Sequence, residues 1–441
     1  MRILFVNQHY PPDGGATGKL VAELSERLVA LGHDVTVLTG WPTYRNATHG
    51  ARFHETRAGV EVVRLPILPR WNGAIARTLH YASFALSAAI RGPWLRRPDV
   101  VLAFSSTPLF GGLAARWIAK RHASRLVYVV QDVYPEIAVA LGELKPGIVQ
   151  RIAHAVDRWV WTQADRVVLI GESLRSVAAE RGFDPAAFPV IPNWADPDRI
   201  TPLAKSAFRA QVGIGADEFV VQYAGNVGRS QDFELILEAA RLVALEDPSV
   251  CFLIVGSGSA DAEVRRAASE SGQVKIIPFQ PERILPEVLA VADVSVVPLR
   301  EGLTRYCVPS KFYSITASGR AVAAALDPDS DVARWIDELD CGFRVDPGDA
   351  EGLARGILAL SRDRARARRQ GANGRSFAES LGSLDRAVAD YDALLREVVT
   401  SPVAESRHEA ELPTIPTDPS PERLDEPTRP LVDALESAGI R

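Results

Sequence analysis

The sequence predicts an α/β protein made of two Rossmann-like domains that face each other across a cleft. Three observations predict this fold. Short apolar runs of strand length alternate with amphipathic segments of helical period, which is typical of a parallel sheet covered by helices. The run 195–206 (ADPDRITPLAKS) has three turn-forming segments and no periodicity, so it separates two such series. In both series, polar or glycine-rich loops follow the strands, where open α/β sheets bind ligands.

The composition is typical of a globular chain that is long enough for two domains. Of its 441 residues, 47% are apolar and 24% are charged. The net charge of −5 argues against nucleic acid as the main partner. The three cysteines lack CxxC spacing, so we expect a reducing cytoplasm, no disulfide framework and no metal site. No run reaches the roughly 20 apolar residues of a spanning helix, so any membrane contact would be peripheral, on the inner face.

The first domain is expected over residues 1–200 and opens with a strand–loop–helix–strand unit. A strand at 2–7 leads into the loop QHYPPDGGATG, a helix over 19–30 and a second strand at 35–38. Gly14 and Gly15 would let a substrate approach the backbone at the helix N-terminus. Because the glycine spacing is not GxGxxG, a dinucleotide site is not indicated.

A mostly apolar run of a dozen residues at 79–90 (LHYASFALSAAI) predicts a helix that is either buried or in contact with a membrane. Arginine and tryptophan flank the run on both sides, within the segment 70–97. Such flanks suit a helix that lies in the interface of an anionic membrane. The alternative is an ordinary buried helix with exposed arginines.

The strand 126–130 runs into Gln131–Glu136 (QDVYPE), which holds two candidate catalytic carboxylates. Asp132 and Glu136 come just past the carboxyl end of a central strand, where catalytic or sugar-binding groups commonly lie. The segment 105–108 (SSTP) has the same position after its own strand. The alternative role for the two carboxylates is helix capping.

The second domain is expected over residues 207–375 and carries the predicted phosphate site. A buried strand at 294–299 is followed by a loop and by a helix that starts at Pro309-Ser310 and ends at Gly319. Ser310 suits the N-cap, and Lys311 in the first turn opposes the helix dipole unless an anion binds there. We therefore predict a phosphate clamp, the alternative being a capped helix with a solvated lysine.

Further donor contacts are expected from the neighbouring loops of the same half. A diphosphate leaving group gains charge as it departs, and cations and loop N–H groups can stabilise that charge without a metal. The candidates are the side chains of Arg229 and Arg305 and the loop N–H groups of Asn226 and Gly256, which follow the strands at 219–223, 251–255 and 294–299.

The C-terminal part is expected to be a helix and a tail. Residues 376–400 are predicted as a helix that packs back on the first domain. Residues 401–441 are rich in proline and acid and poor in apolar residues, so we expect disorder there.

From Arg2 to about Val399 the chain resembles the retaining glycosyltransferases of family 4, which have the GT-B fold. Within that family it is similar to the bacterial sugar transferases of capsule, colanic-acid and O-antigen synthesis, which act on lipid-linked saccharides. The motifs that carry the resemblance occur in the expected order and are HYPPDGGATGKL, GHDVTV, QDVYPE, IPNW, YAGNVGRSQ, VGSG and the segment 309–319.

The resemblance implies a metal-independent transfer of a sugar from a nucleotide-sugar, UDP-linked rather than GDP-linked, to a lipid-linked or polysaccharide acceptor. It implies that the Gly14-Gly15 loop lies near the donor phosphates and acceptor, and that Asp132 and Glu136 face the acceptor or the transferred sugar. No further cofactor is implied.

Two departures from the family pattern concern the donor site. Asn226, Arg229 and Gln231 fall where relatives carry an arginine and a lysine for the diphosphate. The two positions that align best hold amides, so Arg229 and Lys311 would have to compensate. Of two family glutamates, the second aligns with Ser314 and the first falls near Tyr306, so Glu301 would have to substitute. Two alternatives therefore stay open: a sugar-nucleotide epimerase of the same build, and a non-catalytic sugar-nucleotide-binding subunit.

Overall fold

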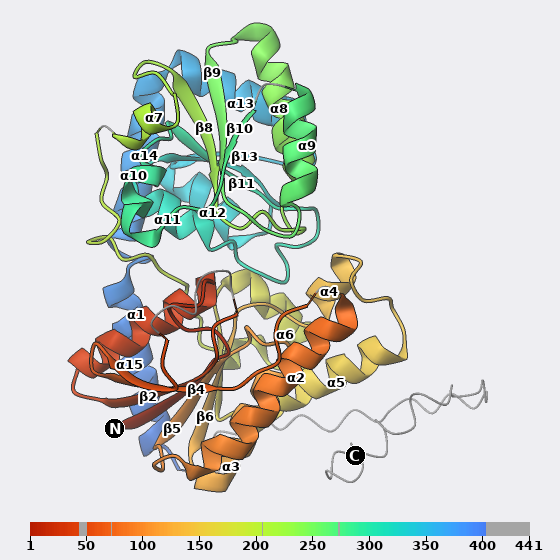
Figure 1. The fold of residues 1–441 in the computed structure, drawn as a ribbon, viewed down its shortest axis with the longest axis vertical. Helices are drawn as coiled ribbons and strands as arrows, with labels where there is room; N and C mark the ends of the chain where they lie inside the picture. Colours follow the sequence, from red (N-terminus) through yellow and green to blue (C-terminus); the bar gives the residue numbers. More distant parts are fainter. Residues whose placement is uncertain (44–50, 72, 205, 272–273, 403–441) are drawn as a thin grey trace. The chain divides into compact units, whose positions relative to one another are not determined.

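The computed structural model describes residues 1–43, 51–71, 73–204, 206–271 and 274–402, which form two parallel-sheet Rossmann-like domains (Figure 1). This confirms the predicted fold class. Nearly all of the predicted disordered tail lies outside the described residues.

The first domain contains a seven-stranded sheet in the order β3-β4-β2-β1-β5-β6-β7. All neighbouring strands are parallel except β3, which pairs antiparallel with β4 at the edge. The runs are rich in valine, isoleucine and leucine because both faces of a parallel sheet are buried. The strands are β1 (Arg2–Val6), β2 (Asp34–Gly40), β3 (His54–Arg57), β4 (Val60–Leu65), β5 (Val100–Phe104), β6 (Arg125–Val130) and β7 (Arg166–Leu169).

Helices cover this sheet in two groups. On one side α2 packs on α3, and α3 packs on α5, whereas α1 packs on α15. The helix predicted at 19–30 starts earlier, at Ala16. The helical elements are α1 (Ala16–Ala30), α2 (Ala74–Arg91), η1 (Gly92–Trp94), α3 (Phe110–His122), α4 (Glu136–Ala140), α5 (Ile148–Gln163), η2 (Glu172–Leu174), α6 (Arg175–Glu180) and η3 (Pro185–Ala187).

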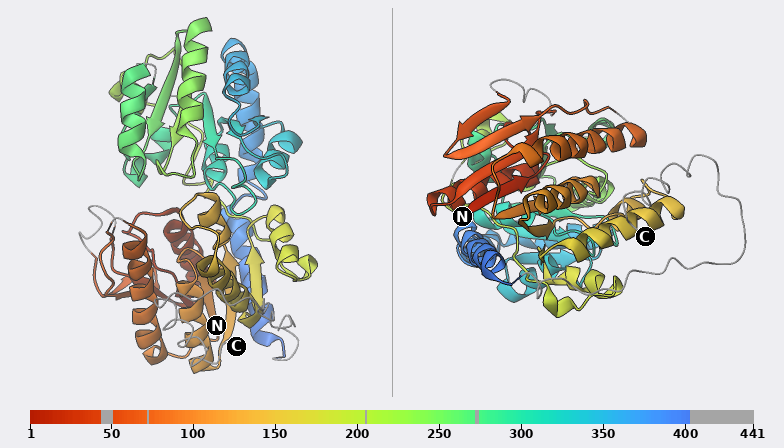
Figure 2. Two further views of the ribbon diagram at one scale, coloured as in Figure 1. Left: turned by 90° about the vertical axis from the view of Figure 1, so that its right-hand side faces the viewer. Right: turned by 90° about the horizontal axis from the view of Figure 1, so that it is seen from below.

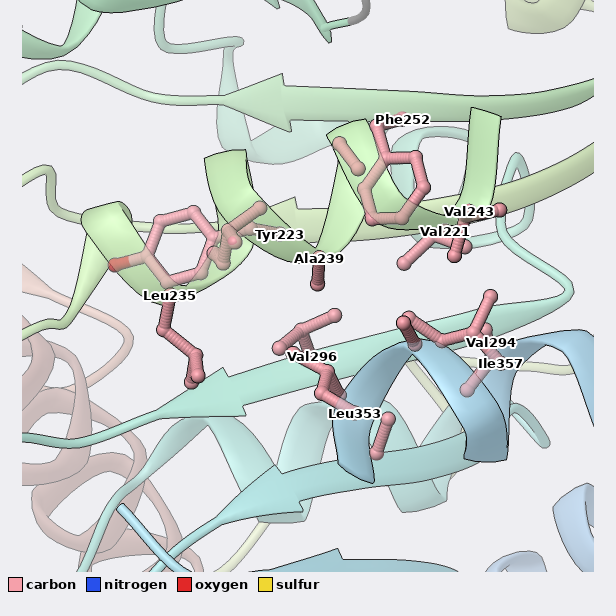
Figure 3. Packing of buried hydrophobic residues seen from close by; sticks show 14 of the residues in the cluster. Val221, Tyr223, Leu235, Ala239, Val243, Phe252, Val294, Val296, Leu353 and Ile357 are labelled. Atoms are coloured by element: carbon pink, nitrogen blue, oxygen red, sulfur yellow. The ribbon is translucent and has the colours of Figure 1, made fainter. Parts of the chain in front are cut away.

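The second domain contains a six-stranded, wholly parallel sheet in the order β10-β9-β8-β11-β12-β13. Val221, Tyr223, Val294 and Val296 on this sheet pack against α8 and α13 (Figure 3). The strand order reverses between β8 and β11, which makes their carboxyl ends the expected ligand position. The strands are β8 (Phe219–Ala224), β9 (Val250–Val255), β10 (Val274–Ile277), β11 (Val294–Pro298), β12 (Ala321–Ala325) and β13 (Gly342–Val345).

The helices of the second half continue to residue 400. They are α7 (Phe208–Gln211), α8 (Phe233–Glu246), α9 (Asp261–Ser271), η4 (Glu282–Ile284), α10 (Leu285–Leu289), α11 (Lys311–Ala317), α12 (Asp331–Leu339), α13 (Ala350–Arg362), α14 (Arg364–Ala378) and α15 (Leu384–Thr400). The predicted domain limit at residue 375 falls inside α14, which packs on α11 and β12.

The last helix, α15, contacts α1 and β6 of the first domain (Figures 1 and 2, blue). His33 Nε2 lies 2.7 Å from Asp392 Oδ1, and Arg166 Nη2 donates to Glu397 Oε1 at 2.9 Å. Tyr391 is fully buried beside Trp194 and Phe104.

Three aromatic side chains hold the short helix α11 in the second domain. The Phe312 ring lies 5.6 Å from that of Trp335 on α12 and 5.3 Å from that of Phe377 on α14. The Trp335 and Phe377 rings are 5.1 Å apart. Because a seven-residue helix has few internal hydrogen bonds, this packing fixes its position.

Replacing Phe377 with alanine is therefore expected to lower the free energy of unfolding by about 3–5 kcal/mol, through lost burial and a cavity beside Phe312. Thermal and urea unfolding measure the change. Phe279→Ala, which removes an exposed ring from the same domain, is the matched control and should have little effect. Equal stability of the two variants would show that the aromatic cluster does not fix α11.

Candidate active site

Three loops meet at the carboxyl end of the second sheet. The loop 225–231 after β8 joins the loop after β11 through a β-bridge between Gln231 and Leu299, and Arg300 N donates to Ser230 O at 3.1 Å. The loop after β9 joins the first of these, because Val227 N donates to Ser257 O at 3.1 Å. The loops therefore form one connected backbone layer at the point where the strand order reverses.

Glycine is required where these loops touch. A Cβ atom at Gly256 would lie 1.9 Å from the carbonyl oxygen of Gly225, and one at Gly258 would lie 2.2 Å from that of Val227. A Cβ at Gly225 would lie 2.7 Å from Cε of Lys311. The glycines thus bring the backbone close to the lysine, and the exposed Asn226 side chain lies beside Gly228 and Gly258.

Lys311, the first residue of α11, is partly exposed and lies against the glycine loops. Its Nζ donates to Gln231 Oε1 at 3.3 Å and lies 5.2 Å from the ring centroid of Tyr223. Burial lowers the pKa of this ammonium group to about 8. Within the described part of the chain no carboxylate forms a salt bridge with it. An ammonium in such surroundings attracts an anion, so a fully solvated lysine does not describe the site.

Ser310 does not cap the helix as predicted. It occupies the position before Lys311, but its backbone is already helical and its side chain makes no capping hydrogen bond. The side chain of Ser314, one turn later, donates to the carbonyl oxygen of Lys311 at 3.0 Å.

Asp132 follows β6 and meets the loop that leads to Lys311. It forms an antiparallel β-bridge with Cys307, and Val133 N donates to Tyr306 O at 2.9 Å. Ser105 Oγ accepts hydrogen bonds from the backbone N–H of Gln131 at 2.8 Å and of Asp132 at 3.2 Å. These contacts place a residue of the first domain beside the predicted phosphate site of the second.

The carboxyl group of Asp132 is partly buried, and burial raises its pKa to about 6. It makes no hydrogen bond to another described residue. Cys307 interacts electrostatically with both charged groups. Burial raises the pKa of its thiol, the Asp132 carboxylate raises it further, and the Lys311 ammonium opposes this. A carboxylate and an ammonium group thus lie within electrostatic range of one cysteine.

The predicted catalytic role of Glu136 is not supported, because other side chains occupy its carboxylate. Arg181 Nη2 donates to its Oε2 at 2.9 Å, and His154 Nδ1 lies 2.8 Å from its Oε1. Arg181 also donates to Asp157 and to the carbonyl oxygen of Tyr134. Glu136 therefore belongs to an ion network that anchors the loop carrying Asp132.

Arg305 pairs with a residue of the first domain, and Arg229 is exposed on the loop after β8. Arg305 forms a salt bridge with Glu180 on α6, which accounts for its charge. Arg229 is exposed, and its backbone carbonyl accepts a hydrogen bond from Arg300 Nε at 3.0 Å. Glu301 is also exposed. Of the three cations predicted to hold the diphosphate, Lys311 is the one whose ammonium group contacts Gln231 at the end of the loop after β8.

The Gly14-Gly15 loop is exposed at the N-terminus of α1. A Cβ at Gly15 would have no atom within 4 Å, so open space adjoins this backbone. The first turn of α1 contains no acidic residue that would compete with an anion.

Three residues of the candidate site were not predicted from the sequence. Cys307 pairs with Asp132 and the Tyr223 ring lies under the Lys311 ammonium group, but a lone cysteine and a strand tyrosine give no signal of such contacts. Asp331 accepts hydrogen bonds at 3.0 Å from the N–H groups of Glu172 and Ser173, and so provides a further contact between residues of the two halves. Its position after Ser330 indicated only a helix start.

Two family models match most of the chain. One, described as a glycosyl transferase 4-like domain, matches residues 15–194, and the other, described as glycosyl transferases group 1, matches residues 218–363. The chain is 29% identical to WcaI, named as a colanic acid biosynthesis glycosyl transferase of Escherichia coli (strain K12), over 81% of this chain and 91% of that protein.

Solved structures show the same fold at low identity. Sucrose-phosphate synthase from Thermosynechococcus elongatus has a TM-score of 0.70 and 21% identity, over 90% of this chain and 99% of that one. Anabaena Alr3699/HepE, solved with UDP-glucose, has a TM-score of 0.69 and 17% identity, over 90% and 100% respectively.

Replacing Glu136 with glutamine tests whether this residue is structural. Burial alone would raise the pKa of Glu136, but the hydrogen bond from His154 and the charge of Arg181 outweigh burial and lower it. The ionised carboxylate therefore stabilises the fold above its ordinary pKa of 4.5, and this contribution is lost as pH falls through the lowered value. At neutral pH we expect the free energy of unfolding of the variant to be lower than that of wild type by about 1–3 kcal/mol, with a lower unfolding temperature. The difference from wild type should shrink in acid. Unchanged stability with abolished turnover would restore the catalytic role.

Proposed function

Because the chain belongs to the glycosyltransferases of family 4, which have the GT-B fold, we propose that it moves a sugar from a UDP-sugar to a lipid-linked or polysaccharide acceptor in cell-surface polysaccharide synthesis. The observation that carries the proposal is the ammonium group of Lys311, which lies against the glycine loop after β8 at the switch point of the second sheet.

The donor diphosphate would lie against Lys311 and the loop N–H groups. When the bond between the sugar and the diphosphate breaks, negative charge grows on the leaving phosphate, and a preorganised cation stabilises it. The resemblance implies that members of the family carry a lysine at the position of Gln231. Here the Lys311 Nζ lies 3.3 Å from the Gln231 amide oxygen, so a cation from another element serves the same place. The solved relative with UDP-glucose supports a uridine donor.

Asp132 would bind the acceptor or the transferred sugar. Asp132 is only partly buried, and with a pKa of about 6 its carboxyl group is mostly ionised at neutral pH. An ionised carboxylate accepts hydrogen bonds from sugar hydroxyls and stabilises positive charge at the reacting carbon. We propose retention of configuration, as in the family.

We also propose that turnover needs no divalent ion, because Lys311 and the adjoining amides can supply the positive charge. In the described residues, no three His, Cys, Asp or Glu side chains gather to hold a metal. Transfer that continues in a chelating buffer would support this proposal, and transfer that needs added Mg²⁺ or Mn²⁺ would contradict it.

Lys311→Ala should weaken UDP-sugar binding by roughly 1.5–3 kcal/mol, about 10–150-fold, because it removes a charge-assisted contact. Titration calorimetry measures the affinity. Lys275→Ala removes an exposed lysine from β10 of the same domain and should bind normally. Equal affinities for the two variants would remove Lys311 from the donor site.

Donor affinity should also depend on pH in a defined direction. Lys311 is charged below its pKa of about 8 and neutral above it. Wild-type affinity is therefore expected to fall as pH rises through about 8, while the Lys311→Ala variant, which binds weakly throughout, shows no such step. A wild-type affinity that stays constant over this range would contradict the assignment.

Asp132→Asn should reduce turnover by roughly 10²-fold or more without destabilising the protein. Burial raises the pKa of this carboxyl, so its ionised form costs stability, and the variant should unfold at the same or a higher temperature. Asp337→Asn, at an exposed carboxylate on α12 of the second domain, is the control. Wild-type turnover in Asp132→Asn would exclude the residue from the site, whereas epimerised donor without acceptor would favour an epimerase.

A further inference from the structure

The outer face of α2 carries a stripe of exposed aliphatic side chains. Ile75, Leu79, Leu86 and Ile90 are 79%, 49%, 64% and 62% exposed. At 100° per residue, these four positions fall within an arc of roughly 60°. The opposite side of the helix is buried and includes Phe84, so only part of the apolar run at 79–90 faces the interior.

Indole rings extend this stripe at both ends and onto α3. Trp71 precedes α2, Trp94 follows it, and Trp117 lies on α3, which packs against α2. All three side chains are exposed. The Trp117 Nε1–H donates to the carbonyl oxygen of Ala89 at 3.1 Å, so its polar atom is satisfied while its ring faces outward. Tryptophan in this arrangement suits the boundary between lipid and water.

The sequence around the stripe is rich in cations, although the whole chain carries −5. Residues 62–131 contain ten lysines and arginines and a single acid, Asp99, and four of the arginines form salt bridges with acids outside this span. Exposed cations without a salt bridge among the described residues are Arg97 after α2 and Lys120 and Arg121 near the end of α3. A second copy that packed through the same face would bring like charges together, whereas anionic lipid complements both the charge and the apolar stripe.

We propose that this surface, called the α2 face and comprising Trp71, Ile75, Leu79, Leu86, Ile90, Trp94 and Trp117, docks on an anionic lipid bilayer with α2 parallel to the membrane. Among the described residues, no helix is both long and apolar enough to cross a membrane. The contact is therefore interfacial, with the aliphatic side chains in the headgroup boundary and the cations among the lipid phosphates.

Docking through the α2 face would bring the site close to a lipid-linked acceptor, an inference that rests on the proposed function. The start of α2 lies at the carboxyl edge of the first sheet, because the chain reaches it from the end of β4. On its buried side, His80 Nε2 lies 2.7 Å from Nε2 of Gln8, which follows β1. His80 Nδ1 donates to the carbonyl of Leu68 at 2.7 Å, so His80 Nε2 accepts from the Gln8 amide. This hydrogen bond joins α2 to the loop that leads to Gly14 and Gly15.

Sedimentation with vesicles tests the α2 face without any substrate. Wild type should bind vesicles of phosphatidylglycerol and phosphatidylcholine, bind pure phosphatidylcholine weakly, and dissociate in high salt. The double variant Leu86→Asp/Ile90→Asp should bind the anionic vesicles at least about tenfold more weakly. Leu245→Asp, at a leucine on α8 that is 74% exposed, should bind like wild type.

Three results would overturn the proposal. Wild type could stay in the supernatant with anionic vesicles, or the double variant could bind them as tightly as Leu245→Asp does. Alternatively, wild type could be a dimer in solution and the double variant a monomer, which would make the α2 face a dimer interface. Turnover on a water-soluble acceptor should be the same in the double variant and wild type. Lys311→Ala should still bind vesicles, so failure of the membrane proposal and failure of the donor site give different patterns.

Discussion

The ammonium group of Lys311, which has no carboxylate partner among the described residues, is the feature on which the rest of the site depends. Its contacts are the amide oxygen of Gln231, at 3.3 Å, and the face of the Tyr223 ring. Neither contact neutralises the charge, so burial lowers the pKa to about 8. An ion held this way costs stability in the free protein, and a bound phosphate offsets that cost. The same imbalance would make the site ready for a diphosphate.

Much of the surrounding structure keeps that group in place and accessible. Close approaches at Gly225, Gly256 and Gly258 allow the backbone loops to meet where side chains would collide. The aromatic cluster under α11 fixes the start of a helix too short to hold itself. On the other side, the ion pair of Arg181 and Glu136 anchors the loop that carries Asp132. The glycines, the aromatic cluster and the ion pair thus set where Lys311 and Asp132 lie.

Local patterns in the sequence predicted the two-domain fold, because strand and helix periods are properties of short segments. They also indicated Lys311 as a candidate phosphate ligand, because a lysine in a first helical turn opposes the helix dipole. They could not predict the pairing of Glu136 with Arg181 or of Arg305 with Glu180, because these partners are 45 and 125 residues apart. The apolar run at 79–90 showed an unusual helix but not which side faces outward, since that depends on packing against α3 and the sheet. Ser310 had the right residue type for a cap, yet its backbone continues the helix.

The most direct test of the account is proton uptake when a UDP-sugar binds. Calorimetry in buffers of different ionisation enthalpy, at a pH near the value of about 8 for Lys311, measures the number of protons taken up. If the diphosphate holds the charged ammonium, wild type should take up about half a proton per UDP-sugar bound, and Lys311→Ala should take up none. Binding without proton uptake, or the same uptake in both proteins, would contradict the central role of Lys311.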